Sequence, residues 1–409
     1  MSCLKVDEIL KDFPILEKKI RGRRLVYLDS AASSLKPVPV VEAVKQFELY
    51  EYSNIHRGVH TLSLQATQRY EEAREKIGKL INANSTDEVI FTYGTTDSLN
   101  MVAYAYGLKH LHRDDEILLT VLEHHSNILP WRAVASLKGA KIKYVNIMDD
   151  GRLDYSDLDE NLSKRTKIAS FTHVSNVVGT IIDIKEVAKR VHEVGGVLVV
   201  DGAQSVPHIM IDVKDLGIDF LAFSGHKMLG PTGIGVLWVR SELLDDLPPL
   251  RLGGGAVREV GIESHSLLGS PHRYEAGTPN ISGAIGLGVA AEYLMKIGMM
   301  NVKRHEEELT EYTLKRFKEL GDSVVVYGPR NVSERCGIIP FNIRGMDPNI
   351  VGTLLDGYGV AVRTGKHCAH LLYERLKIDG AVRASYYIYN TIEDIDLLTS
   401  ALEDIIRMA

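Results

Sequence analysis

Two polar side chains follow consecutive apolar segments in the middle of the chain. The run Val197-Leu-Val-Val ends in Asp201, and the run Asp219-Phe-Leu-Ala-Phe leads into Ser224-Gly-His-Lys227. If both runs are parallel strands joined by one crossover, Asp201 and Lys227 emerge at the same edge of a sheet. An amine and a carboxylate placed in this way suit pyridoxal phosphate, which forms a Schiff base with lysine and needs an acid at its ring nitrogen. Singly, a helix N-cap and a solvated loop lysine explain the two residues equally well, whereas the pair favours the cofactor.

A candidate nucleophile lies near the end of the chain. Cys368 stands in Arg363-Thr-Gly-Lys-His-Cys-Ala-His, with basic side chains on both sides. Such neighbours favour the reactive thiolate. The alternative is a small buried apolar residue, the commonest role of a lone cysteine, and we keep that interpretation for Cys3 and Cys336.

The elements that must position these groups are visible as apolar runs rich in β-branched residues. They alternate with helix-like segments and occupy residues 88–92, 116–120, 141–145, 167–171, 196–200 and 219–223. This alternation predicts βαβ units, and therefore an α/β fold with a mostly parallel sheet covered by helices on both faces. Functional side chains are expected in the loops at the carboxyl ends of the strands.

The length of 409 residues favours more than one domain. Glycines and prolines make residues 248–278 irregular, which suggests an active-site or interface loop. A long polar helix is expected after Asn301, then strands at 323–327 and 337–341, and a last amphipathic helix after Thr391. We predict an N-terminal segment (1–25) packing with the small domain, a large cofactor-binding domain (26–295) and a small C-terminal domain (296–409) that carries the cysteine nucleophile.

The composition excludes several classes of protein. Hydrophobic residues make up 45% of the chain and charged residues 25%, which is ordinary for a globular protein, and the net charge of -6 gives no electrostatic argument for nucleic acid. No apolar run has membrane-spanning length. The odd number and wide spacing of the three cysteines fit a reducing compartment better than a disulfide framework or a zinc site. We therefore expect a soluble cytoplasmic protein that binds neither membrane nor nucleic acid.

Motifs spread over nearly the whole chain resemble one known family. The chain is similar to the fold-type I, class V aminotransferase-like enzymes, and within them to the second, Suf-type group of cysteine desulfurases, which includes selenocysteine lyases. The motifs are Tyr27-Leu-Asp-Ser-Ala-Ala, Asn54-Ile-His-Arg-Gly-Val-His, Gly94-Thr-Thr, Glu123-His-His-Ser-Asn, Thr172-His-Val-Ser-Asn-Val-Val-Gly, Asp201-Gly-Ala-Gln, Ser224-Gly-His-Lys, Tyr274-Glu-Ala-Gly-Thr-Pro, Arg363-Thr-Gly-Lys-His-Cys and Arg383-Ala-Ser.

The resemblance implies a large domain with a mostly parallel seven-stranded sheet and a smaller α+β C-terminal domain. It also implies a phosphate site. Thr95 and Thr96 stand between a predicted strand and helix, where amides and hydroxyls can hold an anion, and Thr96 is the expected direct hydroxyl donor. Ser224 and His226 resemble further phosphate ligands. Thr278 resembles one that reaches in from the neighbouring subunit, which implies a homodimer.

The remaining roles concern the cofactor ring and the substrate. His124 resembles the residue that stacks on the ring, and Asn176 and Gln204 resemble partners of its phenolic oxygen or of the substrate carboxylate. Ordinary loop hydrogen bonding is the alternative for these three. The resemblance makes Arg383 and Arg363 the arginines that recognise the carboxylate. It places His56 and Arg57 near the same pocket.

The activity implied by the resemblance is conversion of L-cysteine to L-alanine, with Lys227 moving a proton and Cys368 taking the sulfur as a persulfide. A Suf scaffold or other acceptor would collect it for iron–sulfur cluster assembly. Selenocysteine lyase, another class V activity and a non-catalytic scaffold remain alternatives. Lys366 stands where the family often has a second histidine, and the residues after Cys368 also differ, so substrate preference and acceptor docking stay open.

Two further patterns are set aside. Gly286-Leu-Gly-Val-Ala-Ala imitates a dinucleotide-binding fingerprint, but it lies in a predicted helix, where small residues indicate close helix packing. Glu123-His-His and Cys368-Ala-His lack a second pair of ligands at metal-binding spacing, so no metal is predicted.

Overall fold

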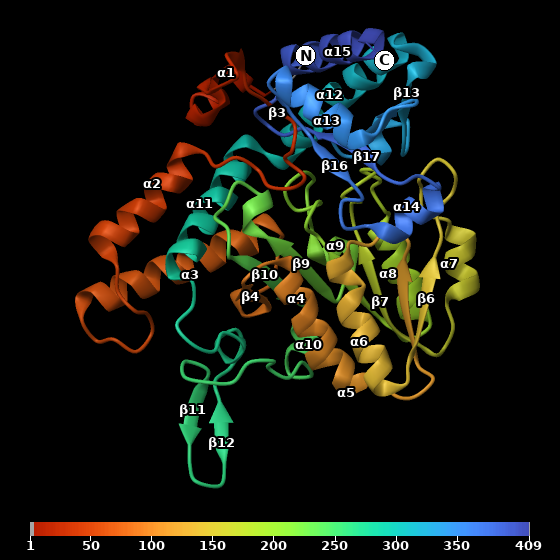
Figure 1. Cartoon of the computed structure of the whole chain (residues 1–409). Helices are drawn as coiled ribbons and strands as arrows, with labels where there is room; N and C mark the ends of the chain where they lie inside the picture. The colour runs from red at the N-terminus through yellow and green to blue at the C-terminus, as the bar shows by residue number, and fades with distance from the viewer. Residues whose placement is uncertain (1–3, 409) are drawn as a thin grey trace.

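The computed structural model describes residues 4–408, and a seven-stranded sheet forms its centre (Figure 1). The strand order is β4-β10-β9-β8-β7-β5-β6, and only β10 runs antiparallel to its neighbours. All six predicted runs are strands of this sheet. The bounds are β4 Val89–Thr92, β5 Glu116–Thr120, β6 Lys141–Val145, β7 Thr166–Thr172, β8 Val197–Asp201, β9 Phe220–Ser224 and β10 Gly235–Val239.

Helices cover both faces of the sheet because side chains alternate along each strand. In β5, Ile117 and Leu119 pack on one face and Leu118 on the other. The first face carries α4 (Thr95–Met101), η4 (Val102–Gly107), α5 (Leu108–His110) and α6 (Leu129–Lys138). The second carries α2 (Val38–Gln46), α3 (Thr61–Leu80), α8 (Ile184–Glu193) and α11 (Ile281–Ile297).

A smaller layer near the C-terminus lies above the large sheet in the view of Figure 1. Its antiparallel sheet has the order β13-β14-β17-β16, with bounds Val324–Val326, Ile338–Ile343, Ala381–Ser385 and Arg363–Gly365. Three helices complete its apolar core: α12 (Met299–Glu319), α13 (Pro348–Gly357) and α15 (Ile392–Met408). The predicted strands at 323–327 and 337–341 and the last helix are thus present, and the domain boundaries stay predictions.

The N-terminal part of the chain reaches this smaller layer. β3 (Val26–Tyr27) pairs in parallel with β15 (Val360–Ala361), so the two ends of the sequence share one short sheet. The remaining short elements are α1 (Val6–Leu10), β1 (Lys19–Ile20), β2 (Arg23–Arg24), α7 (Tyr155–Asn161), α9 (Val213–Leu216), α10 (Ser241–Leu244) and α14 (His370–Leu376).

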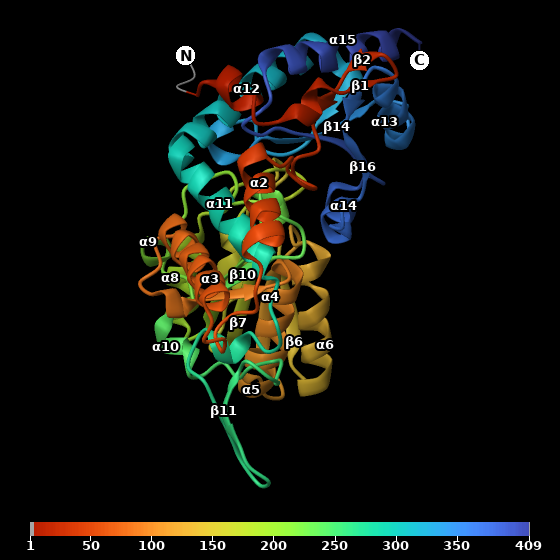
Figure 2. The ribbon, with the colours of Figure 1, turned by 90° about the vertical axis from the view of Figure 1, so that its left-hand side faces the viewer.

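A β-hairpin projects away from the body of the molecule, as both ribbon views show (Figures 1 and 2). It consists of β11 (Val257–Val260) and β12 (His265–Leu267). The sequence suggested only an irregular loop here, so that interpretation is corrected. These strands are short and mostly exposed, and they therefore leave no run of apolar residues in the sequence.

The glycine-rich pattern after residue 286 lies inside α11, as predicted. A Cβ atom added to Gly288 would lie 2.7 Å from the backbone of Ala73 in α3, so the glycine permits close contact of the two helices. Among the described residues no single helix is long and apolar enough to span a membrane; α11 and α12 pass that test only together, across a 73° bend.

Candidate active site

A cavity of about 270 Å³ opens at the carboxyl ends of the central strands and gathers most of the predicted site residues. The large sheet contributes one wall, and the smaller C-terminal layer contributes the other. The predicted residues that line it are Thr95, Thr96, His124, Asn176, Asp201, Gln204, Ser224, His226, Lys227, Arg363, Cys368 and Arg383.

Asp201 and Lys227 lie at the same edge of the sheet, as predicted. Asp201 ends β8, and Lys227 ends the short 3-10 turn that follows the neighbouring strand β9. Burial raises the pKa of Asp201 and lowers the pKa of Lys227 to about 8, and the charge of each group opposes the shift of the other. The lysine amine is therefore neutral, and nucleophilic, at a lower pH than an ordinary lysine.

Hydroxyl and amide groups meet where α4 begins. The Thr95 amide donates to Ser224 Oγ at 2.8 Å, and the Thr95 and Ser224 hydroxyls are 2.7 Å apart. The Thr96 hydroxyl lies 2.7 Å from that of Ser126, a cavity residue that the sequence analysis did not assign. Gly94 has a φ of 147°, which favours glycine, and it brings the chain into this arrangement. The group is suited to bind a phosphate.

Two of the three histidines that line the cavity, His124 and His226, are uncharged near neutral pH. Burial, and then the charge of Lys227, lowers the pKa of His124 and the pKa of His226 to about 4. His124 Nδ1 also accepts a hydrogen bond from the Ser126 amide at 3.1 Å. A neutral imidazole in this position can pack against an aromatic ring without burying a charge.

Two arginines stand on neighbouring strands of the smaller layer. Arg363 in β16 is paired with Arg383 in β17, and both guanidinium groups bind Asp29. Arg383 also donates to the Asn176 carbonyl at 2.8 Å. Asp29 was not assigned from the sequence, although it stands in the quoted motif directly after a strand. It provides the counter-ion that keeps two like charges side by side.

Cys368 occupies a tightly held loop. His367 and Cys368 both have a positive φ, 46° and 56°, which is unfavourable for residues with a side chain. Three contacts fix this backbone. The His125 amide donates to the Cys368 carbonyl at 2.8 Å, Asn176 donates to the His367 carbonyl at 2.8 Å, and His367 Nδ1 lies 2.6 Å from the Tyr373 hydroxyl.

Not all of the basic sequence neighbours of Cys368 supply a cation to its thiol. Lys366 forms an ion pair with Asp379 at 2.7 Å, and burial lowers the pKa of His367 to about 3, so this histidine is neutral. Instead, the electrostatic partners of the Cys368 thiol include Arg363 and Lys227, which share its cavity. Arg363 belongs to the basic segment that the sequence analysis named, whereas Lys227 comes from the large sheet.

Three predicted residues do not reach this cavity within one chain. His56, Arg57 and Thr278 line a second cavity of about 950 Å³, beside the hairpin of β11 and β12. His56 and Arg57 were expected near the Lys227 pocket, and in a single subunit they are not. Their role there, like that of Thr278, stays a prediction that requires a neighbouring subunit.

Several buried polar atoms in the first cavity have no hydrogen-bond partner among residues 4–408. They are Gln204 Oε1, His367 Nε2 and Arg383 Nε. Such atoms are costly unless a ligand satisfies them. Together with the Lys227 amine, the Asp201 carboxylate and the hydroxyl groups where α4 begins, these atoms fit a ligand that carries a phosphate, a ring and a carboxylate. The residues present are those that pyridoxal phosphate and an amino acid require.

Comparison with known proteins agrees with this geometry. A profile of the aminotransferase class V family matches residues 26–398. A probable cysteine desulfurase of Halalkalibacterium halodurans is 48% identical over 400 residues, 98% of each chain, and one of Streptomyces coelicolor is 45% identical over 99% of this chain and 98% of its own.

Solved structures show the same fold. Apo cysteine desulfurase from Thermococcus onnurineus NA1 has a TM-score of 0.95 at 39% identity and covers 100% of both chains. The cysteine desulfurase CsdA of Escherichia coli, as its S-sulfonic acid, has a TM-score of 0.91 at 36% identity and covers 99% of both. The chain therefore belongs to the aminotransferase class V family, in the branch occupied by its cysteine desulfurase relatives.

Proposed function

We propose that this protein is a pyridoxal-phosphate-dependent cysteine desulfurase that converts L-cysteine to L-alanine and takes the sulfur onto Cys368. The observation that carries the proposal is that an accessible thiol lines the same cavity as Asp201 and Lys227. A transaminase has no need of a thiol in this position. The relatives named above support the same activity.

Each cavity residue has a defined task in this reaction. Bound pyridoxal phosphate supplies an electron sink for a substrate amino group. Lys227 holds the cofactor, and its amine, with a pKa lowered to about 8 by burial, moves the proton at the substrate Cα. The Asp201 carboxylate would accept the hydrogen bond of the protonated ring nitrogen, and neutral His124 would cover the ring.

The arginine pair would bind the substrate carboxylate. Arg383 offers its unpartnered Nε, and Arg363 is more exposed beside it. Planar guanidinium groups bind a carboxylate in a fixed orientation, so they would set the direction of the substrate sulfur. Asp29 holds both groups in place before the substrate arrives.

Cys368 would perform the sulfur transfer. Its thiolate attacks the substrate sulfur, an S–S bond forms and the substrate C–S bond breaks. The electron pair of the broken bond stays on the substrate carbon, which takes up a proton to become the methyl group of alanine. The product on the enzyme is a persulfide, and a second thiol must remove the terminal sulfur before the next cycle.

The finer assignments are also proposals. We infer that the protein belongs to the Suf-type group, delivers sulfur to a scaffold for iron–sulfur cluster assembly, and works in the cytoplasm. The free thiols of Cys336 and Cys368 suit a reducing compartment. We infer a homodimer because Thr278, His56 and Arg57 lie together in a second cavity, where they are available to a neighbouring subunit.

The decisive experiment is intact-mass analysis of the purified yellow protein after incubation with L-cysteine, together with measurement of alanine. We expect an added sulfur atom on Cys368 and alanine in solution. Cys368→Ser should abolish both. Cys336→Ser is the matched control, because Cys336 is buried and burial raises its pKa, so it should change neither.

Other outcomes would point to the alternatives. Cys368→Ser could lose sulfur release from cysteine and keep full activity on selenocysteine or in transamination. That result would indicate a different class V activity. A colourless protein in which borohydride fixes no cofactor on Lys227 would indicate a non-catalytic scaffold.

A further inference from the structure

Three potential metal ligands meet beside the second cavity, which His56 and His272 line. His56 precedes α3, Glu71 lies on α3, and His272 follows the β11–β12 hairpin. One ligand atom of each lies within 4.8 Å of those of the other two. The rings of His56 and His272 meet edge to face, with centroids 4.6 Å apart.

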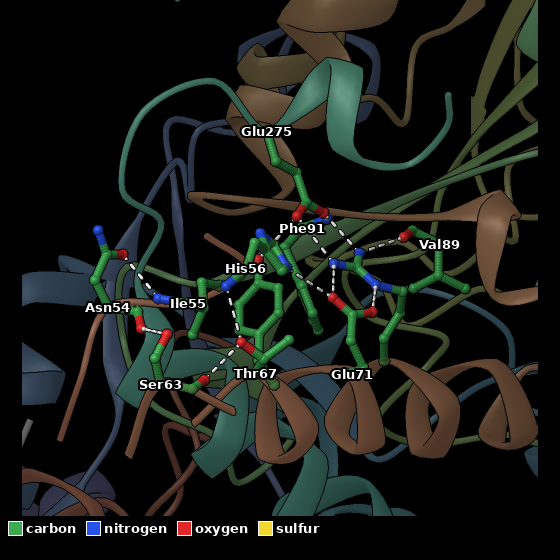
Figure 3. A network of polar contacts seen from close by, with 11 residues as sticks. Asn54, Ile55, His56, Ser63, Thr67, Glu71, Val89, Phe91 and Glu275 are labelled. Carbon is green, nitrogen blue, oxygen red and sulfur yellow. Dashed lines mark hydrogen bonds and ion pairs between the residues drawn. The ribbon is translucent and has the colours of Figure 1, made fainter. Parts of the chain in front are cut away.

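The backbone of His56 is held in an unusual conformation. Its φ is 72°, and its amide donates to the Thr67 hydroxyl at 2.8 Å. His56 Nε2 lies 3.1 Å from Glu71 Oε1. Figure 3 draws the two side chains directed toward each other, from the segment before α3 and from α3 itself. A non-glycine residue in this region of conformational space requires support from its surroundings, and such residues concentrate at functional sites.

Glu71 is also oriented in advance. Arg74 Nε donates to Glu71 Oε2 at 2.8 Å, and Arg74 Nη2 donates to Oε1 at 3.5 Å, so that Oε1 lies nearer to His56, at 3.1 Å. The charge of Arg74 opposes a cation, but Arg74 is shared with Glu275, at 2.6 and 2.9 Å. Two carboxylates around one guanidinium leave the local charge negative. Supporting contacts that fix a ligand in this way are typical of metal sites.

One ring nitrogen of His272 is available for a ligand. His272 Nδ1 is buried without a hydrogen-bond partner in the described part of the chain. An imidazole nitrogen that carries no proton has a lone pair for a metal.

We propose that His56, Glu71 and His272 bind one divalent cation of the zinc class. Two imidazoles and a carboxylate are a ligand set that zinc accepts, with a fourth position left for water or an incoming group from the cavity. Calcium and magnesium are disfavoured, because they require mostly oxygen ligands. This proposal does not depend on the desulfurase activity.

The position of the ligands gives the cation a mechanical consequence. His272 belongs to the segment that joins the hairpin to Thr278, whereas Glu71 belongs to the long helix α3. A cation bound by both, and by His56, fixes the base of the hairpin to the body of the protein. Metal binding should therefore reduce the opening of residues 253–278 and protect them from proteases.

The test measures zinc binding by equilibrium dialysis with metal analysis, on the holoenzyme carrying Cys368→Ser so that this thiol cannot bind the metal. We expect one saturable zinc site per chain. His272→Gln and Glu71→Gln should each weaken its affinity at least about tenfold. Glutamine at 71 keeps an acceptor for Arg74, and circular dichroism without metal checks that both variants are folded.

His112→Gln is the matched control, because this exposed histidine lies elsewhere, and it should bind zinc normally. Zinc should also slow protease cleavage within residues 253–278, and His272→Gln should remove that protection. Absence of saturable binding, equal affinity in all the variants, or loss of binding only in His125→Gln would overturn the proposal. The last result would place the metal at His125 and His370, whose rings are in contact.

Discussion

His370 Nδ1 lies 2.7 Å from His125 Nε2, and the two rings stack with centroids 4.6 Å apart. His370 begins α14 directly after the Cys368 loop, and His125 lies in the turn after β5 in the large sheet. The His125 amide also binds the Cys368 carbonyl. The histidine pair thus fastens the nucleophile loop of the smaller layer to the cofactor-binding sheet.

We expect His370→Ala to slow persulfide formation about fivefold, because losing one hydrogen bond costs about 1 kcal/mol and lets the strained loop move. Cofactor absorbance should not change. Single-turnover mass analysis measures the rate. His370→Asn, which can still donate to His125, should restore most of it, and His112→Ala is a neutral control. Equal rates in the alanine variant and the wild type would show that the contact has no role in positioning.

The loading of cofactor onto Lys227 should depend on pH. Burial lowers the pKa of the amine from the ordinary 10.5 to about 8, and only the neutral amine attacks an aldehyde. Below about pH 8 the rate of loading into apoenzyme should fall about tenfold per pH unit, and above it the rate should level off. The appearance of yellow colour after mixing measures it.

Asp201→Asn provides an internal check on this profile. The charge of Asp201 raises the pKa of Lys227, so removing it should move the midpoint to lower pH. A rate that keeps rising up to about pH 10 would mean that the lysine is not shifted.

Arg383→Lys should raise the KM for cysteine about 10- to 100-fold, with a smaller effect on kcat. Lysine keeps the charge but loses the planar fork and the free Nε, and hydrogen bonds to a charged group contribute about 1.5–3 kcal/mol. Steady-state alanine production gives both constants. Arg344→Lys, at an exposed arginine outside the cavity, should leave them unchanged. A loss confined to kcat would remove Arg383 from carboxylate recognition.

Gly288→Ala should lower the free energy of unfolding by about 2 kcal/mol, because the new methyl group meets the backbone of Ala73 and α11 must move away from α3. Thermal and denaturant melting measure the change. Gly357→Ala is the matched control: it lies in a helix, and a Cβ there meets nothing within 4 Å. Similar melting of both variants would contradict the proposed close packing.

The sequence was sufficient for the parts of the fold that leave strong local patterns. Buried parallel strands are continuous apolar runs, so β8 and β9 were visible, and with them the positions of Asp201 and Lys227. β10 was not among the predicted runs, since Gly230, Gly233 and Gly235 interrupt the chain where it begins, and the exposed hairpin has no apolar pattern at all. β10 and the hairpin are strands because of the strands they pair with, and that pairing is not visible in their own residues.

The site was predictable to a similar degree. Residues within motifs, such as Ser224 and Arg383, come together as expected. The role of Asp29 depends on two arginines more than 300 positions away in the sequence, and no local sequence pattern predicts that contact. For Cys368, the neighbours in the sequence included Arg363, which shares its cavity, but Lys366 pairs with Asp379 and Lys227 comes from a distant segment.

The pairing of β3 with β15 has a consequence for how the protein is made. On the ribosome, residues 26–27 emerge more than 300 residues before residues 360–361. Asp29 therefore has neither arginine partner until Arg363 and Arg383 have been synthesised. A nascent chain can complete the lysine side of its pocket first, because Lys227 precedes both arginines, and it gains its amino-acid recognition later.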